Sequence, residues 1–191
     1  MFKEENEGFP MKHINPHKII SAAFIEKTPA GSLVLAATEA GLARLFFCSR
    51  KDYDAFINAN QLPVDEKPNE IVKEALHQVT EYFDGKRVEF DLLLDLEGQP
   101  PFRVKALSAC AKIPFGKVLT YGGLAAKAGN PKAARAAGGA MAHNPIALII
   151  PCHRVVGSDK GLHGFSSPGG LKTKATLLRH EGVIIEHERV V

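Results

Sequence analysis

The chain of 191 residues contains no tryptophan and three cysteines, Cys48, Cys110 and Cys152. The cysteines lie far apart and include no Cys-x-x-Cys pair, so the sequence predicts neither a disulfide framework nor a zinc knuckle. It also lacks an apolar run long enough to cross a bilayer, and its first residues lack the basic start and apolar core of a signal peptide. These absences predict reduced thiols and a cytoplasmic protein without a membrane partner.

Charge is unevenly divided along the chain, although the net charge of the whole is only +3. Residues 1–100 carry 11 Lys and Arg against 17 Asp and Glu, or −6, whereas residues 101–191 carry 13 against 4, or +9. An excess of basic charge in one half is typical of a surface that faces a polyanion such as nucleic acid. Two solvated surfaces of opposite sign are the alternative explanation.

The first half has the pattern of a small antiparallel sheet. Its apolar and β-branched runs are separated by short turns that contain glycine, which predicts a three-stranded meander. The predicted strands cover residues 18–25, 32–38 and 42–47. A further strand is expected over residues 88–95.

Two helices are expected between the third and the fourth of these strands. Residues 69–83 place apolar side chains at intervals near three and four, and a shorter helix is expected over residues 50–59. The Glu-Gly-Gln-Pro-Pro segment at 97–101 interrupts the pattern, and the sign of the charge changes close to it. We therefore expect two domains, an N-terminal α/β domain of residues 1–97 and a C-terminal domain of residues 98–191.

The second half is predicted to be mostly helical. Thr120 can cap a helix that Gly129 ends, and Asn130-Pro131 supplies an N-cap and a first-turn proline for the next. Two short helices joined by a tight Gly-Asn turn are typical of a helix-turn-helix. The predicted helices cover residues 102–112, 121–128, 131–141 and 171–180, and the tail at 183–191 is a candidate short strand.

Nearly all side chains between Lys132 and Met141 are small, with Arg135 the exception inside the run. Small side chains let a helix approach another surface closely. That surface is either a protein neighbour, with Arg135 a solvated charge, or a groove of DNA. The charge of +9 on this half favours DNA.

Cys152 and His153 adjoin between two apolar, strand-like runs. The Pro-Cys-His step is therefore predicted to be a turn held on both sides. A nucleophilic thiol needs a base, which an imidazole can be, and Glu181 is a candidate carboxylate to orient that imidazole. A buried core cysteine is the alternative reading. No further cysteine or closely spaced histidine pair completes a metal site, so none is predicted.

Three segments together resemble a known family. The stretch Lys132–Met141, the pair Asn144-Pro145 and the sequence Ile-Pro-Cys-His-Arg-Val-Val at 150–156 are closely similar to the O6-alkylguanine-DNA alkyltransferases, also called methylated-DNA–protein-cysteine methyltransferases. The similarity covers residues 102–157 and resumes over 169–182, whereas the first half matches only in the order of its elements. The resemblance implies a ribonuclease-H-like N-terminal α/β domain and a mostly helical C-terminal domain with a winged helix-turn-helix.

The resemblance also implies direct repair of DNA in a single turnover. Cys152 would accept the alkyl group of O6-alkylguanine irreversibly and without a cofactor, and O4-alkylthymine is a second candidate substrate. His153 would act on Cys152 through a bound water, Glu181 would orient His153, and Asn144 would fix the turn. The implied partner is double-stranded DNA, bound by a monomer through the minor groove with the damaged nucleotide flipped out.

Further roles follow from the same resemblance. Arg135 would fill the space that the flipped nucleotide leaves, and Tyr121 would turn the phosphate and assist the departure of guanine. Ala142 stands where some relatives carry a second arginine, which implies either a lower DNA affinity or one that depends on Lys127 and Lys132 instead. The remaining implied DNA contacts are Thr120, Lys132 and Ala136, and the implied substrate-pocket residues are Met141, Ser166, Ser167 and Lys174.

Two other functions fit parts of the sequence. One is a protein of the same fold that binds alkylated DNA without removing the group, against which the set Cys152, His153 and Glu181 argues. The other is a Cys-His hydrolase of a small substrate, against which the basic helix-turn-helix argues.

Overall fold

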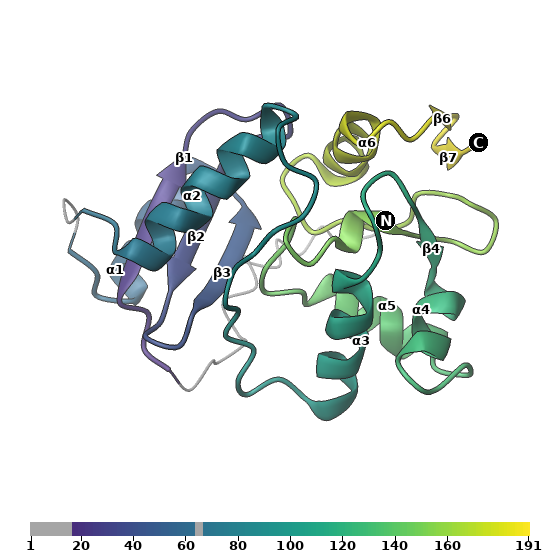
Figure 1. Cartoon of the computed structure of the whole chain (residues 1–191), viewed down its shortest axis with the longest axis horizontal. Coiled ribbons are helices and arrows are strands. Elements are labelled where there is room, and N and C mark those ends of the chain that lie inside the picture. The colour runs from purple at the N-terminus through teal and green to yellow at the C-terminus, as the bar shows by residue number, and fades with distance from the viewer. Residues whose placement is uncertain (1–16, 64–66) are drawn as a thin grey trace, which may run out of the picture.

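A computed structural model describes residues 17–63 and 67–191, which form two packed parts (Figure 1). The first part holds a three-stranded sheet with a helix on each face, and the second is mostly helical, as the predicted α/β fold requires. The elements, in chain order, are β1 (Ser21–Ile25), β2 (Leu33–Ala37), β3 (Leu42–Phe47), α1 (Arg50–Ala59), α2 (Glu70–Phe83), α3 (Pro101–Ala111), β4 (Leu119–Thr120), α4 (Tyr121–Lys127), α5 (Ala134–Ala142), the 3₁₀ helix η1 (Cys152–Arg154), β5 (Val155–Val156), α6 (Gly170–His180), β6 (Ile185–Glu186) and β7 (Arg189–Val190).

The sheet has the order β1-β2-β3 with both pairs antiparallel, which confirms the predicted meander. The central strand, β2, is completely buried. Its side chains alternate between two cores: Leu33 and Leu35 lie in the cluster that includes α2, and Val34 and Ala36 lie in the cluster that includes α1. Because both faces are covered, β2 is apolar throughout and does not alternate with polar residues.

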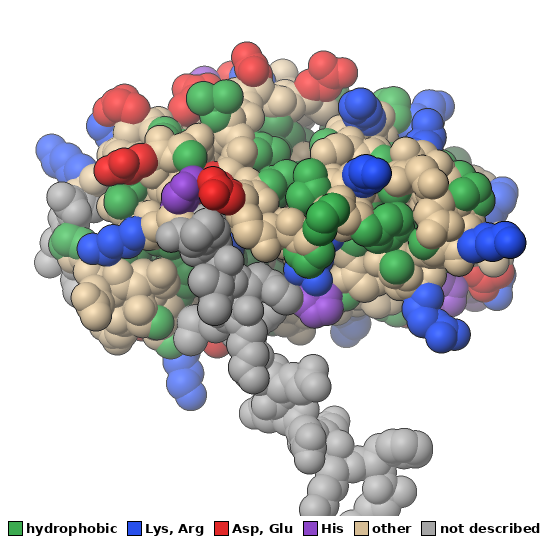
Figure 2. Space-filling view, turned by 90° about the horizontal axis from the view of Figure 1, so that it is seen from below, with side chains coloured by type: hydrophobic (Ala, Val, Ile, Leu, Met, Phe, Trp, Pro, Cys, Tyr) green, Lys and Arg blue, Asp and Glu red, His purple; other side chains and the backbone are tan. Residues whose placement is uncertain are grey.

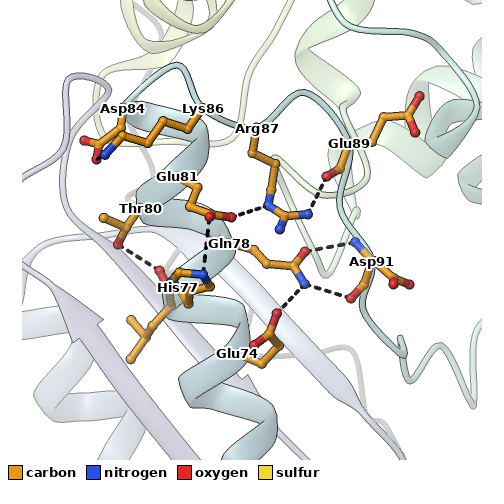
Figure 3. Close-up of polar contacts among 11 residues, drawn as sticks. Glu74, His77, Gln78, Thr80, Glu81, Asp84, Lys86, Arg87, Glu89 and Asp91 are labelled. Atoms are coloured by element: carbon orange, nitrogen blue, oxygen red, sulfur yellow. Dashed lines mark hydrogen bonds and ion pairs between the residues drawn. The ribbon is translucent and has the colours of Figure 1, made fainter.

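Residues 88–95 do not form a strand, contrary to the prediction. The segment leaves α2 in an extended form, but within it Leu94 alone pairs with the sheet, through an isolated bridge to Leu42. The buried side chain of Gln78 takes the place of a neighbouring strand (Figure 3). Its Nε2 donates to the carbonyl oxygen of Asp91 at 2.8 Å, and its Oε1 accepts from the amide nitrogen of Asp91 at 2.9 Å.

The helix-turn-helix pair is formed by α4 and α5, which pack against each other and against α3. Thr120 caps α4 as predicted, since its Oγ1 accepts a hydrogen bond from the amide of Gly123 at 3.0 Å. Gly129 follows the helix with a φ of 92°, a conformation that favours glycine.

Helix α5 begins at Ala134, three residues later than predicted. The side chain of Asn130 accepts from the amide of Lys132 at 3.2 Å and so closes a turn of its own. Pro131 therefore precedes the helix, and the predicted N-cap at Asn130 is wrong.

The segment that carries the thiol is fixed at both ends. On one side, Leu45 of β3 donates from its nitrogen to the Pro145 carbonyl at 2.9 Å, and its carbonyl accepts from the amide of Ala147 at 2.8 Å. On the other side, β5 pairs with β4 in a parallel ladder that the sequence did not predict. The stiff frame expected around Cys152 is therefore built from the edge of the sheet and from β4.

One cluster of buried apolar side chains runs through both parts and includes Leu45, Tyr82, Leu107 and Ile146. The tail forms a small hairpin of β6 and β7, which refines the single strand expected there. Within the described ranges, no helix combines the length and the apolar character needed to cross a membrane.

Candidate active site

Cys152 opens the 3₁₀ helix η1, where its amide donates to the carbonyl of Ile150 at 2.8 Å. Asn144 braces this turn, because its Nδ2 donates to the same carbonyl at 2.8 Å and its Oδ1 accepts from the amide of Ile146 at 3.1 Å. Burial raises the pKa of the Cys152 thiol above its ordinary value, and a hydrogen bond from Asn144 and the charge of Lys174 offset part of this rise. At rest the group is therefore a thiol that needs a base.

His153 offers an unprotonated nitrogen at this position. Its Nε2 lies 2.7 Å from Oε1 of Glu181, and both side chains are completely buried. An ionised carboxylate only accepts hydrogen bonds, so Nε2 carries the hydrogen and Nδ1 is left as an acceptor. Nδ1 is buried and has no hydrogen-bond partner in the described part of the chain. Burial lowers the pKa of His153, which keeps the imidazole neutral.

Glu181 is held by a ring of donors. Arg154 binds it through two bonds, from Nε to Oε2 at 2.8 Å and from NH2 to Oε1 at 2.9 Å. The hydroxyl of Tyr82 donates to Oε1 at 2.8 Å, and the amide of Gly116 donates to Oε2 at 3.2 Å. Burial alone would raise the pKa of Glu181, but the bonds from His153 and Arg154 outweigh it and lower the pKa to about 2. The carboxylate is therefore ionised and cannot rotate.

Sequence reasoning missed both Arg154 and Tyr82. Arg154 had a signal, because a charged residue between two buried apolar runs must find a partner. Tyr82 had none, since 99 residues separate it from Glu181 and it lies in the predicted apolar face of a helix.

A cavity of about 110 Å³ opens at Cys152. Of the predicted pocket residues, Met141 and Ser166 line it, and Ser166 Oγ donates to the carbonyl of Ala142 at 3.2 Å. Tyr121, which was predicted to contact DNA and to assist the departure of guanine, lines it as well. Ser167 is absent from the lining, and its Oγ is buried without a partner among the described residues. The full lining consists of Tyr121, Gly138, Met141, Ala142, Cys152, Gly164, Phe165 and Ser166.

Lys174 also stands outside the cavity wall. Its ammonium group is buried and donates to the carbonyls of Val155 at 2.6 Å and His163 at 3.0 Å. Burial lowers its pKa to about 8. The hydroxyl of Tyr121 donates to the same His163 carbonyl at 3.2 Å, so these two side chains anchor the loop that carries Phe165 and Ser166.

Three of the predicted DNA contacts lie on α5 or in the turn just before it. Arg135, Ala136 and Lys132 are exposed, and Arg135 has no hydrogen-bond or ion-pair partner among the residues that the structure describes. Thr120 is half-buried and engaged in capping α4. In Figure 2, Lys and Arg side chains predominate over the half that holds α3 to α5, and Asp and Glu side chains gather over the sheet half and the upper rim.

One set of described residues, His17, Asp95 and Glu97, is close enough to hold a metal ion, although no metal site was predicted. The two ring nitrogens of His17 lie 2.9 Å from Asp95 Oδ2 and 3.2 Å from Glu97 Oε2. Thr38 also donates to Asp95 Oδ2 at 2.6 Å. The three groups already satisfy one another as an ion-paired cluster, remote in sequence from Cys152.

Comparison with known proteins identifies the family. The model for the ribonuclease-like domain of 6-O-methylguanine DNA methyltransferase matches residues 22–96, and the model for the DNA-binding domain matches residues 101–183. The methylated-DNA–protein-cysteine methyltransferase of Methanosarcina barkeri is 41% identical over 158 residues, covering 82% of this chain and 94% of that protein. The constitutive enzyme of Bacillus subtilis is 38% identical over 159 residues, covering 82% and 93%.

Solved structures agree with this result. A crystal structure of the O6-methylguanine methyltransferase of Mycobacterium tuberculosis has a TM-score of 0.69 and 35% identity, covering 84% of this chain and 92% of that one. A crystal structure of Mycobacterium tuberculosis OGT in complex with DNA has a TM-score of 0.67 with the same identity and coverage. The resemblance found in the sequence is confirmed, and the chain belongs to the 6-O-methylguanine DNA methyltransferase family.

Proposed function

We propose that this protein repairs alkylated DNA directly, by moving the alkyl group of O6-alkylguanine onto the sulfur of Cys152. The observation that carries the proposal is the orientation of His153. Its Nε2–H is committed to Glu181, so Nδ1 is the nitrogen available to a buried thiol at the end of a cavity. This is the arrangement that nucleophilic catalysis by cysteine needs.

The reaction balances without a cofactor. The thiol proton passes through a bound water to His153 Nδ1, and the sulfur attacks the carbon attached to O6. The new S–C bond forms as the C–O6 bond breaks, and the guanine that leaves takes up the proton. The thioether on Cys152 has no route back to a thiol, so each molecule acts once.

Four other side chains are assigned supporting roles. Asn144 holds the turn that presents the sulfur, and Lys174 supplies a nearby positive charge that favours the thiolate. Tyr121 and Ser166, in the cavity wall, contact the base that enters, and Tyr121 assists its departure.

A base inside a stacked duplex cannot reach this cavity, so the nucleotide must be flipped out at a cost of a few kcal/mol. We assign this step to the C-terminal domain of residues 98–191, with α5 in the minor groove and Arg135 in the gap left by the base. Small side chains on α5 suit a close approach, and the minor groove is read with little sequence preference. Weak sequence preference suits a protein that must find damage at any sequence. We assign the whole reaction to a monomer.

The test is transfer of a methyl group to the intact protein. The chain is incubated with duplex DNA that contains O6-methylguanine, and the intact mass and the Cys152 peptide are measured. One added methyl on that peptide, absent in the Cys152→Ser variant and limited to one per molecule, is expected. DNA binding without any added methyl would contradict the transferase function and support a protein that only recognises alkylated DNA. Repeated turnover of an ester would support a hydrolase. A parallel incubation with O4-methylthymine duplex tests the second candidate substrate.

A further inference from the structure

The N-terminal part of the chain contributes a hydrogen bond to the active site. Tyr82 lies near the end of α2, is completely buried, and donates from its hydroxyl to Oε1 of Glu181 at 2.8 Å. The same oxygen accepts from His153 Nε2 at 2.7 Å and from Arg154 NH2 at 2.9 Å. Tyr82 and His153 therefore share one acceptor atom.

The position of the Tyr82 ring is fixed by contacts from several elements. The ring centroid lies 4.8 Å from His180 of α6 and 6.1 Å from Phe115, which precedes β4. His180 also hydrogen-bonds to the Tyr82 carbonyl at 2.7 Å. Burial and the neighbouring Glu181 carboxylate raise the pKa of Tyr82, so the phenol stays protonated and remains a donor.

We propose that Tyr82 is a positioning residue for alkyl transfer, which limits the hold of Glu181 on His153 and so keeps His153 a neutral base. This inference rests on the proposed function. A carboxylate oxygen that loses one donor carries more negative charge toward the donors that remain. Without the Tyr82 hydroxyl, Glu181 would stabilise the imidazolium form of His153 more strongly, and fewer molecules at neutral pH would hold a base able to accept the thiol proton.

Among the described residues, the donors to Glu181 other than His153 itself differ from Tyr82, because Arg154 is a cation and the Gly116 amide binds Oε2. The charged and titratable groups that face it are Cys152 and Arg154 of η1, Lys174 of α6, and Glu181 just after α6, with Tyr82 of α2 acting through Glu181. Arg154 and Lys174 are cations, which disfavour imidazolium, and Arg154 keeps Glu181 ionised. Among these groups, Tyr82 is the neutral one that donates to Oε1 of Glu181, the oxygen that also accepts from His153.

The test is the Tyr82→Phe variant, which keeps the ring and removes the hydroxyl. The rate of benzyl transfer from free O6-benzylguanine is measured from pH 5 to pH 9 as the concentration of the reagent is varied, which separates binding from the chemical step. Because Tyr82 does not line the cavity, binding is expected to be unchanged. The acid limb of the chemical step is expected to move upward by roughly one pH unit, the size of shift that one hydrogen bond to a charged group produces.

Two further variants sharpen the result. Tyr53→Phe removes a hydroxyl from the ring that stacks on Phe24 in the other core, and its pH profile should match the wild type. Replacing Tyr82 with 3-fluorotyrosine, a stronger donor, should move the acid limb downward, and it serves also if Tyr82→Phe does not fold. A wild-type pH profile in the Tyr82 variants, or a uniform loss of rate that follows a loss of thermal stability, would overturn the role of Tyr82 alone. A wild-type chain that accepts no benzyl group would overturn the proposed function and this role with it.

Discussion

At the scale of single residues, the role proposed for Arg135 distinguishes nucleotide flipping from alkyl transfer, because only a duplex substrate requires flipping. Flipping a nucleotide costs a few kcal/mol, and a cation in the vacated space offsets part of it. We expect Arg135→Ala to slow repair of duplex O6-methylguanine by roughly 10-fold to 100-fold, with little change in the reaction with free O6-benzylguanine. Single-turnover rates on both substrates check this. The matched control is Arg179→Ala, an exposed arginine of α6, and equal losses on both substrates would contradict the role.

Glu181 links the site to the stability of the fold. Its pKa in the folded chain is about 2, below the ordinary value of 4.5, so its contribution is present above pH 4.5 and is lost as the pH falls toward 2. The full contribution is about 3 kcal/mol. Glu181→Gln also leaves the buried Arg154 without its counter-charge.

The free energy of unfolding of the wild type should therefore exceed that of Glu181→Gln most at neutral pH. The difference should shrink by about 3 kcal/mol between pH 4.5 and pH 2. Denaturant unfolding at several pH values measures it, with the exposed Glu186→Gln as control. A difference that does not depend on pH would show that Glu181 is not the ionised group inferred here.

The sequence predicted the residues whose chemistry is local and missed those whose partner is distant. Cys152, His153 and Asn144 lie within ten positions of one another in a motif, and the structure brings them together with Glu181. Tyr82 belongs to the other half of the chain. The apolar pattern of its helix already explained it as a core residue, so nothing pointed to its hydroxyl. No periodicity distinguishes a tyrosine that only packs from one that also donates.

At the scale of elements, the segment after α2 shows how one side chain can replace a strand. The sequence pattern predicted a strand at 88–95 from the order of apolar and polar side chains. That order does not show which groups form hydrogen bonds with the backbone. Gln78 satisfies both backbone groups of Asp91, and Arg87 pairs with Glu81 at 2.7 Å at the start of the segment (Figure 3). The same limit explains why α5 begins at Ala134 and not at Pro131 as predicted. A hydrogen bond to the side chain of Asn130 closes the preceding turn, and the sequence pattern does not show such a bond.

Gln78→Met keeps the length of the side chain and removes both bonds to Asp91, together with the bond from Nε2 to Glu74 Oε1 at 2.7 Å. Each lost hydrogen bond costs about 1 kcal/mol, so we expect the free energy of unfolding to fall by about 3 kcal/mol. Amide exchange at Asp91 should accelerate as well. Urea unfolding and hydrogen exchange measure the two effects, with His77→Met, an exposed neighbour on α2, as control. Unchanged exchange at Asp91 would show that the segment is held by other contacts.

At the scale of the whole molecule, the two halves differ in charge but share one core. The buried cluster joins Leu45 of the sheet to Leu107 of α3, and Tyr82 joins α2 to the active site. The domain boundary at residue 97 stays a prediction, because sequence composition marks a change in charge and not a break in packing. The uneven charge does imply that the affinity for DNA depends on ionic strength, and that the second half of the chain causes this dependence.

Binding to DNA by the half with a charge of +9 should release counterions, so the logarithm of the affinity should fall linearly with the logarithm of the salt concentration. Removing one phosphate contact with Lys132→Ala should reduce that slope by about 1, since each phosphate contributes about 0.9. Lys51→Ala, an exposed lysine of α1 in the acidic half, should leave it unchanged. Fluorescence anisotropy with duplex DNA over a salt series measures the slopes, and the rate with free O6-benzylguanine over the same series should stay constant. Equal slopes in the two lysine variants would place the DNA elsewhere than on the turn before α5.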